Sequence, residues 1–170
     1  MMECKLCDLH KTREKIVNGH GNPNAEIMFV GEAPGWNENI EGIPFVGKAG
    51  SVLDELLSHI HINREDIYIT NIVKCRPPEN RDPTQDEIDK CSKFLDMEIE
   101  TVGPRIIVPL GRFATKYIVE KFGQEFTSIG KMHGVPIVIG GMTIVPMYHP
   151  AYAIHDPTKK DMLLSDFENI

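Results

Sequence analysis

The sequence lacks any long hydrophobic run. Within its 170 residues, no stretch approaches the roughly 20 apolar residues that a bilayer-spanning helix needs. The first residues also lack the apolar core of a secretory signal. We therefore expect a cytoplasmic protein without membrane contact, in a reducing compartment that disfavours disulfides.

Repeats, low-complexity tracts and excess positive charge are also absent. Proline and glycine lie between periodic segments instead of gathering in linkers, so we expect one domain spanning residues 1–170. The formal net charge of -7 argues against unselective coating of nucleic acid. A local basic patch is still compatible with that total.

Cysteine is rare, and the spacing of the four cysteines predicts a metal centre. Cys4 and Cys7 form a Cys-x-x-Cys pair, whereas Cys75 and Cys91 lie far along the chain. Four thiols with none left over favour a single tetrathiolate site that clamps distant segments together. Zinc and iron-sulfur clusters both accept four thiolates, so the spacing alone leaves the metal open.

Short apolar runs alternate with amphipathic segments along the chain. Runs at residues 25–30, 67–73, 105–110 and 143–147 predict strands, and helical periodicity at 52–60 and 88–99 predicts helices. Thr84-x-x-Glu87 is a capping box that starts the second of these helices. Two apolar runs around Gly140-Gly141 predict a hairpin. The alternation predicts an α/β fold with a parallel sheet covered on both faces.

Polar motifs follow the predicted strands. Glu32 comes directly after the first strand, Asn71 lies at the end of the second, and His149 follows the fourth. Because the carboxyl ends of parallel strands meet at one edge of a sheet, we expect these three residues to share one pocket.

Four segments resemble the family 4 uracil-DNA glycosylases: residues 31–35 (GEAPG), 44–50 (PFVGKAG), 70–78 (TNIVKCRPP) and 149–152 (HPAY). The resemblance extends from Cys4 to about Pro157. It implies a three-layer α/β/α fold with a central four-stranded parallel sheet. It also implies a 4Fe-4S cluster bound by Cys4, Cys7, Cys75 and Cys91.

The same resemblance implies an enzyme that flips deoxyuridine out of DNA and hydrolyses its N-glycosidic bond, releasing uracil in base excision repair. His149 would donate a hydrogen bond to uracil O2, where negative charge develops as the base departs. The Asn71 carboxamide would complement uracil N3-H and O4 and reject cytosine, which presents the reverse pattern. Glu38 would either exclude the methyl group of thymine or orient the attacking water.

Further contacts follow from the resemblance. Phe45 would stack on the flipped base, and backbone groups of Glu32, Ala33 and Pro34 would line the base pocket. The partner would be uracil-containing DNA, single- or double-stranded. The protein would act as a monomer associated with the nucleoid, and whether a sliding clamp or repair factor also binds is left open. The expected DNA-binding residues lie at the start of one helix and in the segment around Cys75: Lys48, Gly50, Ser51, Lys74, Arg76 and Arg81.

Two other interpretations compete with this one. The first is an iron-sulfur module that binds nucleic acid and recognises uracil with little turnover, and the second is a zinc-stabilised nucleotide-binding protein. Ala153 stands where many members of the family carry a leucine wedge. Either Tyr152 or Ile154 would serve as the wedge, or wedging is weak and lowers activity on duplex relative to single strands.

Overall fold

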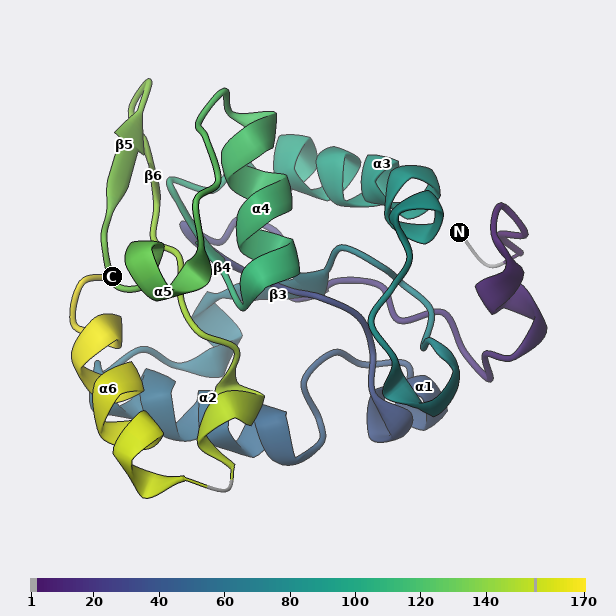
Figure 1. The fold of residues 1–170 in the computed structure, drawn as a ribbon, viewed down its shortest axis with the longest axis horizontal. Helices are drawn as coiled ribbons and strands as arrows, with labels where there is room; N and C mark the ends of the chain where they lie inside the picture. Colours follow the sequence, from purple (N-terminus) through teal and green to yellow (C-terminus); the bar gives the residue numbers. More distant parts are fainter. Residues whose placement is uncertain (1–2, 155) are drawn as a thin grey trace.

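The computed structural model describes residues 3–154 and 156–170, which form a mixed six-stranded sheet with helices on both faces (Figure 1). The sheet order is β1-β3-β2-β4-β6-β5. The four central strands are parallel, and the two edge strands pair antiparallel to their neighbours. The strands are β1 (His20–Gly21), β2 (Ile27–Gly31), β3 (Tyr68–Asn71), β4 (Ile106–Pro109), β5 (Ile137–Ile139) and β6 (Met142–Ile144).

The predicted parallel four-stranded sheet is therefore confirmed, with one short strand added at each edge. The predicted hairpin is β5 and β6, which turn at Gly140 and Gly141, both with positive φ. The last strand is shorter than predicted and ends before Pro146, which has no N–H to donate to a neighbouring strand. Beyond it, Met147 makes only an isolated parallel bridge to Leu110.

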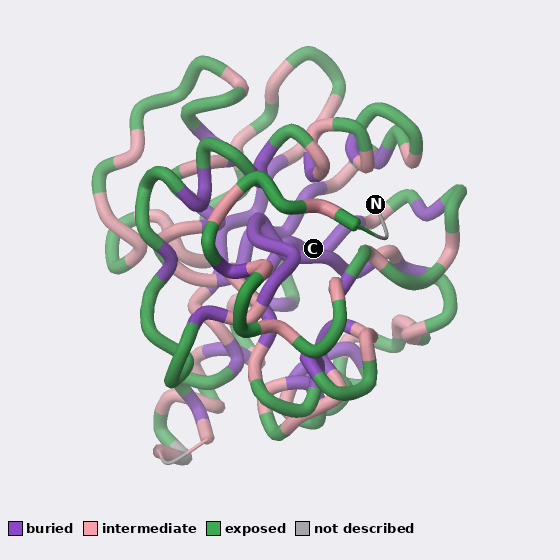
Figure 2. Tube along the Cα trace, turned by 90° about the vertical axis from the view of Figure 1, so that its right-hand side faces the viewer, coloured by how far each residue is buried: buried purple, intermediate pink, exposed green. Residues whose placement is uncertain are grey.

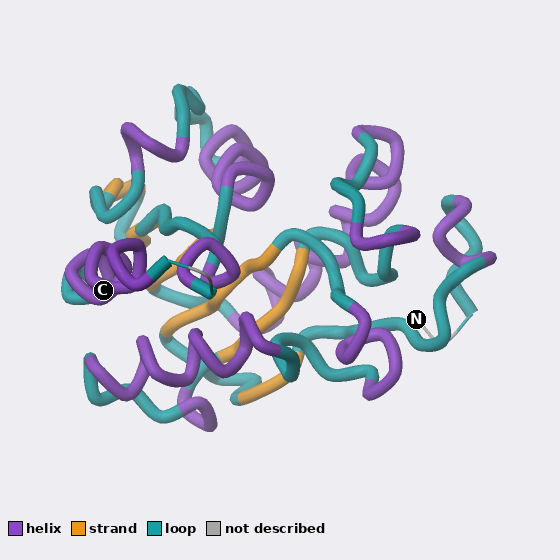
Figure 3. Tube along the Cα trace, turned by 60° about the horizontal axis from the view of Figure 1, so that its bottom comes forward, coloured by secondary structure: helices purple, strands orange, loops and turns teal. Residues whose placement is uncertain are grey.

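The helices form two outer layers. Figures 1 and 3 show α3 and α4 on one side of the sheet and α2 and α6 on the other. The α-helices are α1 (Trp36–Glu41), α2 (Lys48–His59), α3 (Gln85–Val102), α4 (Arg112–Lys121), α5 (Ile129–Met132) and α6 (Pro157–Phe167). The described residues also form four 3-10 helices, of which the first precedes α1 and the others lie between α-helices: η1 (Asp8–Lys11), η2 (Arg64–Asp66), η3 (Pro78–Asn80) and η4 (Pro150–Ala153).

Alternation along the central strands fills both layers of core, seen as the buried centre in Figure 2. Met28 and Val30 belong to the cluster that contains Leu95 of α3. Phe29 points the other way and stacks on Phe167 of α6 at 5.9 Å between ring centroids. Each such fully buried side chain contributes about 1.5–3 kcal/mol of transfer free energy, so the two cores hold the three layers together.

The predicted capping box is present at the start of α3. Thr84 Oγ1 accepts a hydrogen bond from the N–H of Glu87 at 3.3 Å, and Glu87 Oε2 accepts one from the N–H of Thr84 at 2.8 Å. Among the described residues, no helix combines the length and hydrophobicity that crossing a bilayer requires.

Candidate active site

A pocket of about 740 Å³ opens at the carboxyl ends of β2 and β3. Seven of the residues predicted for the site line it: Glu32, Ala33, Glu38, Phe45, Lys48, Asn71 and His149. Pro34 is buried, and Gly35 lines the pocket instead. The lining also includes Trp36, Asn37, Asn80, Ala151 and Tyr152, to which the sequence analysis gave no place in the base pocket.

Strand register places Asn71 at the floor of this pocket. Asn71 is the last residue of β3 and lies opposite Gly31 of β2. The residue is only 2% exposed. A Cβ atom at Gly31 would overlap Asn71 Oδ1 and would lie 2.8 Å from the Phe45 ring. Glycine at position 31 therefore makes room for the carboxamide and the phenyl ring side by side.

Phe45 is held in a strained backbone conformation. Its φ of 55° lies in the left-handed region, which costs a non-glycine residue about 1–3 kcal/mol. Arg64 Nη2 compensates by donating to the carbonyl oxygens of Pro44 at 2.8 Å and Phe45 at 2.7 Å. A Cβ atom at Gly50 would overlap the Phe45 carbonyl, so α2 packs closely against this loop.

Glu38 anchors the same loop from the other side. Its Oε1 atom accepts hydrogen bonds from the N–H groups of Val46 at 3.0 Å and Gly47 at 2.9 Å. This anchoring role could not be predicted from the sequence, because the bonds join separate turns of the chain and follow no local spacing. The predicted action of Glu38 on thymine or on water stays a prediction, for which its second carboxylate oxygen is available near Gly35.

His149 lies beside Phe45 with a defined tautomer. The two rings stack at 5.6 Å between centroids, with an interplanar angle of 27°. His149 Nδ1 accepts a hydrogen bond from the N–H of Ala151 at 3.1 Å, which leaves the ring proton on Nε2. Burial lowers the pKa of His149 to about 4, although the Glu38 carboxylate opposes the shift. The imidazole is therefore a neutral Nε2–H donor at neutral pH.

Glu32 is the other group in the pocket with a shifted pKa. Burial raises the pKa of its carboxyl to about 7, and the nearby Asp82 carboxylate adds to the shift, while Arg112 opposes it. The Glu32 carboxyl therefore changes charge near neutral pH, where an ordinary glutamate is fully ionised.

The predicted contact of Lys74 with DNA is wrong. Lys74 is 0% exposed, and its Nζ atom donates to Glu98 Oε2 at 2.6 Å, Thr70 Oγ1 at 2.5 Å and the Asn71 carbonyl oxygen at 2.7 Å. The basic character of the segment gave no sign that this side chain folds back into the core. Instead of binding phosphate, Lys74 fixes the backbone of Asn71.

Of the other predicted DNA-binding residues, Arg76 is half-buried and donates from Nε to Asn80 Oδ1 at 2.7 Å. The remaining four divide into two groups. Lys48 and Ser51 are exposed at the start of α2, where the cap residue Gly47 has no side chain to occupy the free N–H groups. Gly50 is buried, and the Arg81 guanidinium is held by both carboxylate oxygens of Glu87 at 2.7 and 2.9 Å. The roles of these residues toward DNA stay predictions.

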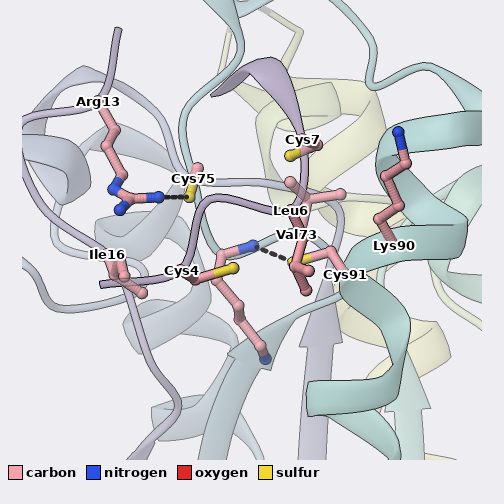
Figure 4. Close-up of a pocket in the computed structure, with 10 residues that line it drawn as sticks. Cys4, Leu6, Cys7, Arg13, Ile16, Val73, Cys75, Lys90 and Cys91 are labelled. Carbon is pink, nitrogen blue, oxygen red and sulfur yellow. Dashed lines mark hydrogen bonds between the residues drawn. The ribbon is translucent and has the colours of Figure 1, made fainter. Parts of the chain in front are cut away.

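The four cysteines line one small pocket away from the site, as Figure 4 shows. All four are free thiols, contributed by the N-terminal segment, the loop after β3 and helix α3. Arg13 Nη1 donates to Cys75 Sγ at 3.3 Å, and the N–H of Lys74 donates to Cys91 Sγ at 3.3 Å.

The four thiols line one space, although among the described residues no three Cys, His, Asp or Glu side chains are arranged to share a single metal ion. Burial raises the pKa of the Cys91 thiol to about 11 and also raises the pKa of Cys75 and Cys7. Uncoordinated thiols here would stay protonated, and metal ligation is what removes such protons. The N–H donors and the Arg13 charge would then offset the negative charge of the sulfurs.

Known proteins similar to this chain identify its family. Residues 18–168 match the family described as the uracil DNA glycosylase superfamily. A type-4 uracil-DNA glycosylase of Archaeoglobus fulgidus is 47% identical over 100% of this chain and 87% of its own length. Type-4 enzymes of Sulfurisphaera tokodaii (48%, 100% of this chain and 80% of the relative) and Saccharolobus solfataricus (49%, 99% and 80%) are similar to the same degree.

A three-layer α/β fold with a polar pocket at the carboxyl ends of its strands has the arrangement in which α/β enzymes bind their ligands. The chain belongs to the uracil-DNA glycosylase superfamily, and its full-length similarity groups it with the type-4 uracil-DNA glycosylases. The predicted family is thereby confirmed.

The buried Lys74–Glu98 pair gives a first prediction. Glu98→Gln leaves the enclosed ammonium without its counter-charge, and we expect the free energy of unfolding in urea to fall by about 3 kcal/mol. Asp86→Asn, which removes the exposed partner of Lys90 on the same helix, should cost less than about 1 kcal/mol. Equal losses in the two variants would contradict the prediction.

Glu32 gives a second prediction, on pH dependence. Its folded pKa of about 7 lies above the ordinary value of 4.5, so the folded state binds more protons than the unfolded state between these values. The contribution of Glu32 to the stability of the wild type should fall as pH rises from 4.5 through 7. Glu32→Gln cannot ionise, so its stability relative to wild type should be greater at pH 8 than at pH 5 in urea titrations. A difference that does not change with pH would refute this assignment.

Proposed function

We propose that the pocket binds a uracil flipped out of DNA and that His149 stabilises the departing base as the N-glycosidic bond breaks. Membership of the type-4 family makes the protein a uracil-DNA glycosylase that excises uracil in DNA repair, with DNA as its substrate. The observation that carries the mechanism is the hydrogen bond from the Ala151 N–H to His149 Nδ1. It presents Nε2–H to the pocket that Asn71 also lines.

Stabilisation of the leaving base follows from the state of His149. Breaking the bond leaves the sugar with oxocarbenium character and the base with negative charge. A donor already aimed at that charge stabilises the transition state more than the ground state, and one such donor is worth about 10²–10³ in rate. Because the pKa of His149 is about 4, the donor is neutral and keeps its proton throughout the reaction at pH 7.

Selection of uracil is assigned to Asn71. The Asn71 backbone is fixed by Lys74 and its carboxamide is confined beside Gly31, so the side chain cannot reorient freely to suit another base. A buried amide that meets the donor and acceptor pattern of cytosine leaves polar groups unpaired, which costs about 1–3 kcal/mol for each group. Rejection of cytosine therefore depends on how rigidly Asn71 is held.

The free-energy cost of extruding the base is offset by stacking and by phosphate contacts. Unstacking a nucleotide from a duplex costs a few kcal/mol, and Phe45 offers a buried aromatic face in the pocket to recover part of it. The start of α2 lies on the rim, where Lys48 lines the pocket and the free N–H groups can bind a phosphate. Ser51 is exposed one turn further along the helix. The chain would act as one domain and as a monomer.

Cys4, Cys7, Cys75 and Cys91 would hold a 4Fe-4S cluster. Support comes from four thiols lining one cavity and from the two N–H donors that reach their sulfurs. The chemistry such a group would supply here is a cross-link that ties the N-terminal segment to α3 and to the loop after β3. Cys75 directly follows Lys74, so this cross-link would also brace the network under Asn71.

Substitution of His149 tests the mechanism. His149→Ala should lower the single-turnover rate of uracil release from a single-stranded oligonucleotide by about 10²–10³-fold at pH 7.5. His20→Ala, at an exposed histidine of β1, is the matched control and should retain the wild-type rate. The wild-type rate should show no titration of His149 between pH 5.5 and 8. A His149→Ala rate within threefold of wild type would remove His149 from the mechanism.

The cysteine centre has its own test. Anaerobically purified protein should be brown and contain about four iron and four acid-labile sulfide per chain. Cys91→Ala should lose the visible absorbance and melt at a lower temperature, because the cross-link to α3 is gone. If the protein is colourless and contains one zinc per chain, the cysteines form a structural zinc site instead of a cluster. The glycosylase assignment would not change.

A further inference from the structure

Trp36 is a large aromatic side chain left exposed at the rim of the active-site pocket. It begins α1, it is 57% exposed, and it lines the same cavity as Asn71, Phe45 and His149. The uracil-binding candidates Asn71 and Phe45 are only 2% and 5% exposed. The pocket therefore has two levels, a deep one for the extruded base and a shallow one formed around Trp36.

The position of the Trp36 ring is fixed by its neighbours. The Arg76 guanidinium lies over the indole at 5.0 Å from the ring centroid, and Arg76 Nε donates to Asn80 Oδ1 at 2.7 Å. Asn80 also lines the pocket. Two residues further along α1, Glu38 is buried and anchored to the Phe45 loop. The indole is thus mounted on a rigid part of the molecule.

The chemistry of this position suits a nucleobase. An exposed indole offers a flat aromatic face, on which any base can stack, and the adjacent guanidinium supplies positive charge for the nucleic-acid backbone in a protein of net charge -7. An isolated exposed aromatic has no structural need to lie at the mouth of a base-binding pocket. The cavity of about 740 Å³ also lies in the upper part of the range typical of ligand sites, which is more room than one pyrimidine ring needs.

We propose that Trp36, backed by Arg76, forms a second nucleobase subsite that stacks the base next to the extruded uracil on the same strand. The inference rests on the proposed function, because the deep level of the pocket must hold the uracil for the shallow level to meet its neighbour. Stacking here holds the DNA strand beside the pocket while the N-glycosidic bond of the extruded nucleotide is broken. Trp36 is a binding residue in this scheme and touches none of the reacting atoms.

Intrinsic fluorescence tests the subsite directly, because Trp36 is the single tryptophan of the chain. The probe is a single-stranded oligonucleotide with one 2′-fluoro-deoxyuridine, which resists cleavage because the fluorine disfavours the cationic sugar. Binding should quench the wild-type fluorescence. The quench should be lost when the neighbouring base is replaced by an abasic site on one side of the uracil. The 5′ and 3′ replacements are separate arms that identify which neighbour is stacked.

Kinetics with cleavable oligonucleotides complete the test. Removing the stacked neighbour should raise KM of the wild type about tenfold, within the roughly 5- to 150-fold range that stacking contacts support. Trp36→Ala should raise KM to a similar extent and become insensitive to the abasic neighbour, while Trp36→Phe should keep most of the affinity. Met97→Ala, at a 61% exposed residue of α3, is the control and should match wild type.

Two outcomes overturn the subsite. One is fluorescence that does not change when the oligonucleotide binds, and the other is a Trp36→Ala variant that remains as sensitive to the abasic neighbour as wild type. Failure of the proposed function looks different. In that case the wild type releases no uracil at all, and the fluorescence arms still decide whether Trp36 stacks a base.

Discussion

The active site depends on the hydrogen bonds made by the buried ammonium group of Lys74. It binds Glu98 of α3, the Thr70 hydroxyl and the Asn71 carbonyl, while the backbone N–H of the same residue reaches Cys91 Sγ. One residue thus connects the end of β3, a covering helix and the cysteine pocket. A buried charge is stable only with its partners in place, so this arrangement fixes the floor of the pocket in one geometry.

A second constraint acts on the opposite wall. Phe45 occupies a left-handed backbone conformation that Arg64 and Glu38 hold from two sides. Strain retained at such a position is typical of sites where the exact placement of a side chain matters for binding. His149 stacks on the ring that this loop presents, so the leaving-base donor and the loop share one support. The pocket is therefore preorganised before DNA arrives.

Most of the fold could be predicted because its signals are local. Apolar runs of strand length, a capping box at Thr84 and glycine pairs at a turn all depend on neighbouring residues, and they reappear as β2, β3, β4, the start of α3 and the β5–β6 hairpin. Asn71 and His149 could be placed at one edge because parallel strands end together. The short edge strand β1 left no such signal, since its two residues, His20 and Gly21, have no apolar alternation.

The sequence by itself determined which residue types follow the strands and which family the motifs indicate. It also determined that the chain has four cysteines, enough for one tetrathiolate site. Only the tertiary structure decided which charges are buried: Lys74 enters the core, whereas Arg76 lies at the rim against Trp36. The same holds for Glu38, whose bonds to Val46 and Gly47 cross between turns. Glu98 lies 24 residues from Lys74, and Val46 and Gly47 lie 8 and 9 residues from Glu38, so neither set of bonds follows the regular spacing of a helix or strand.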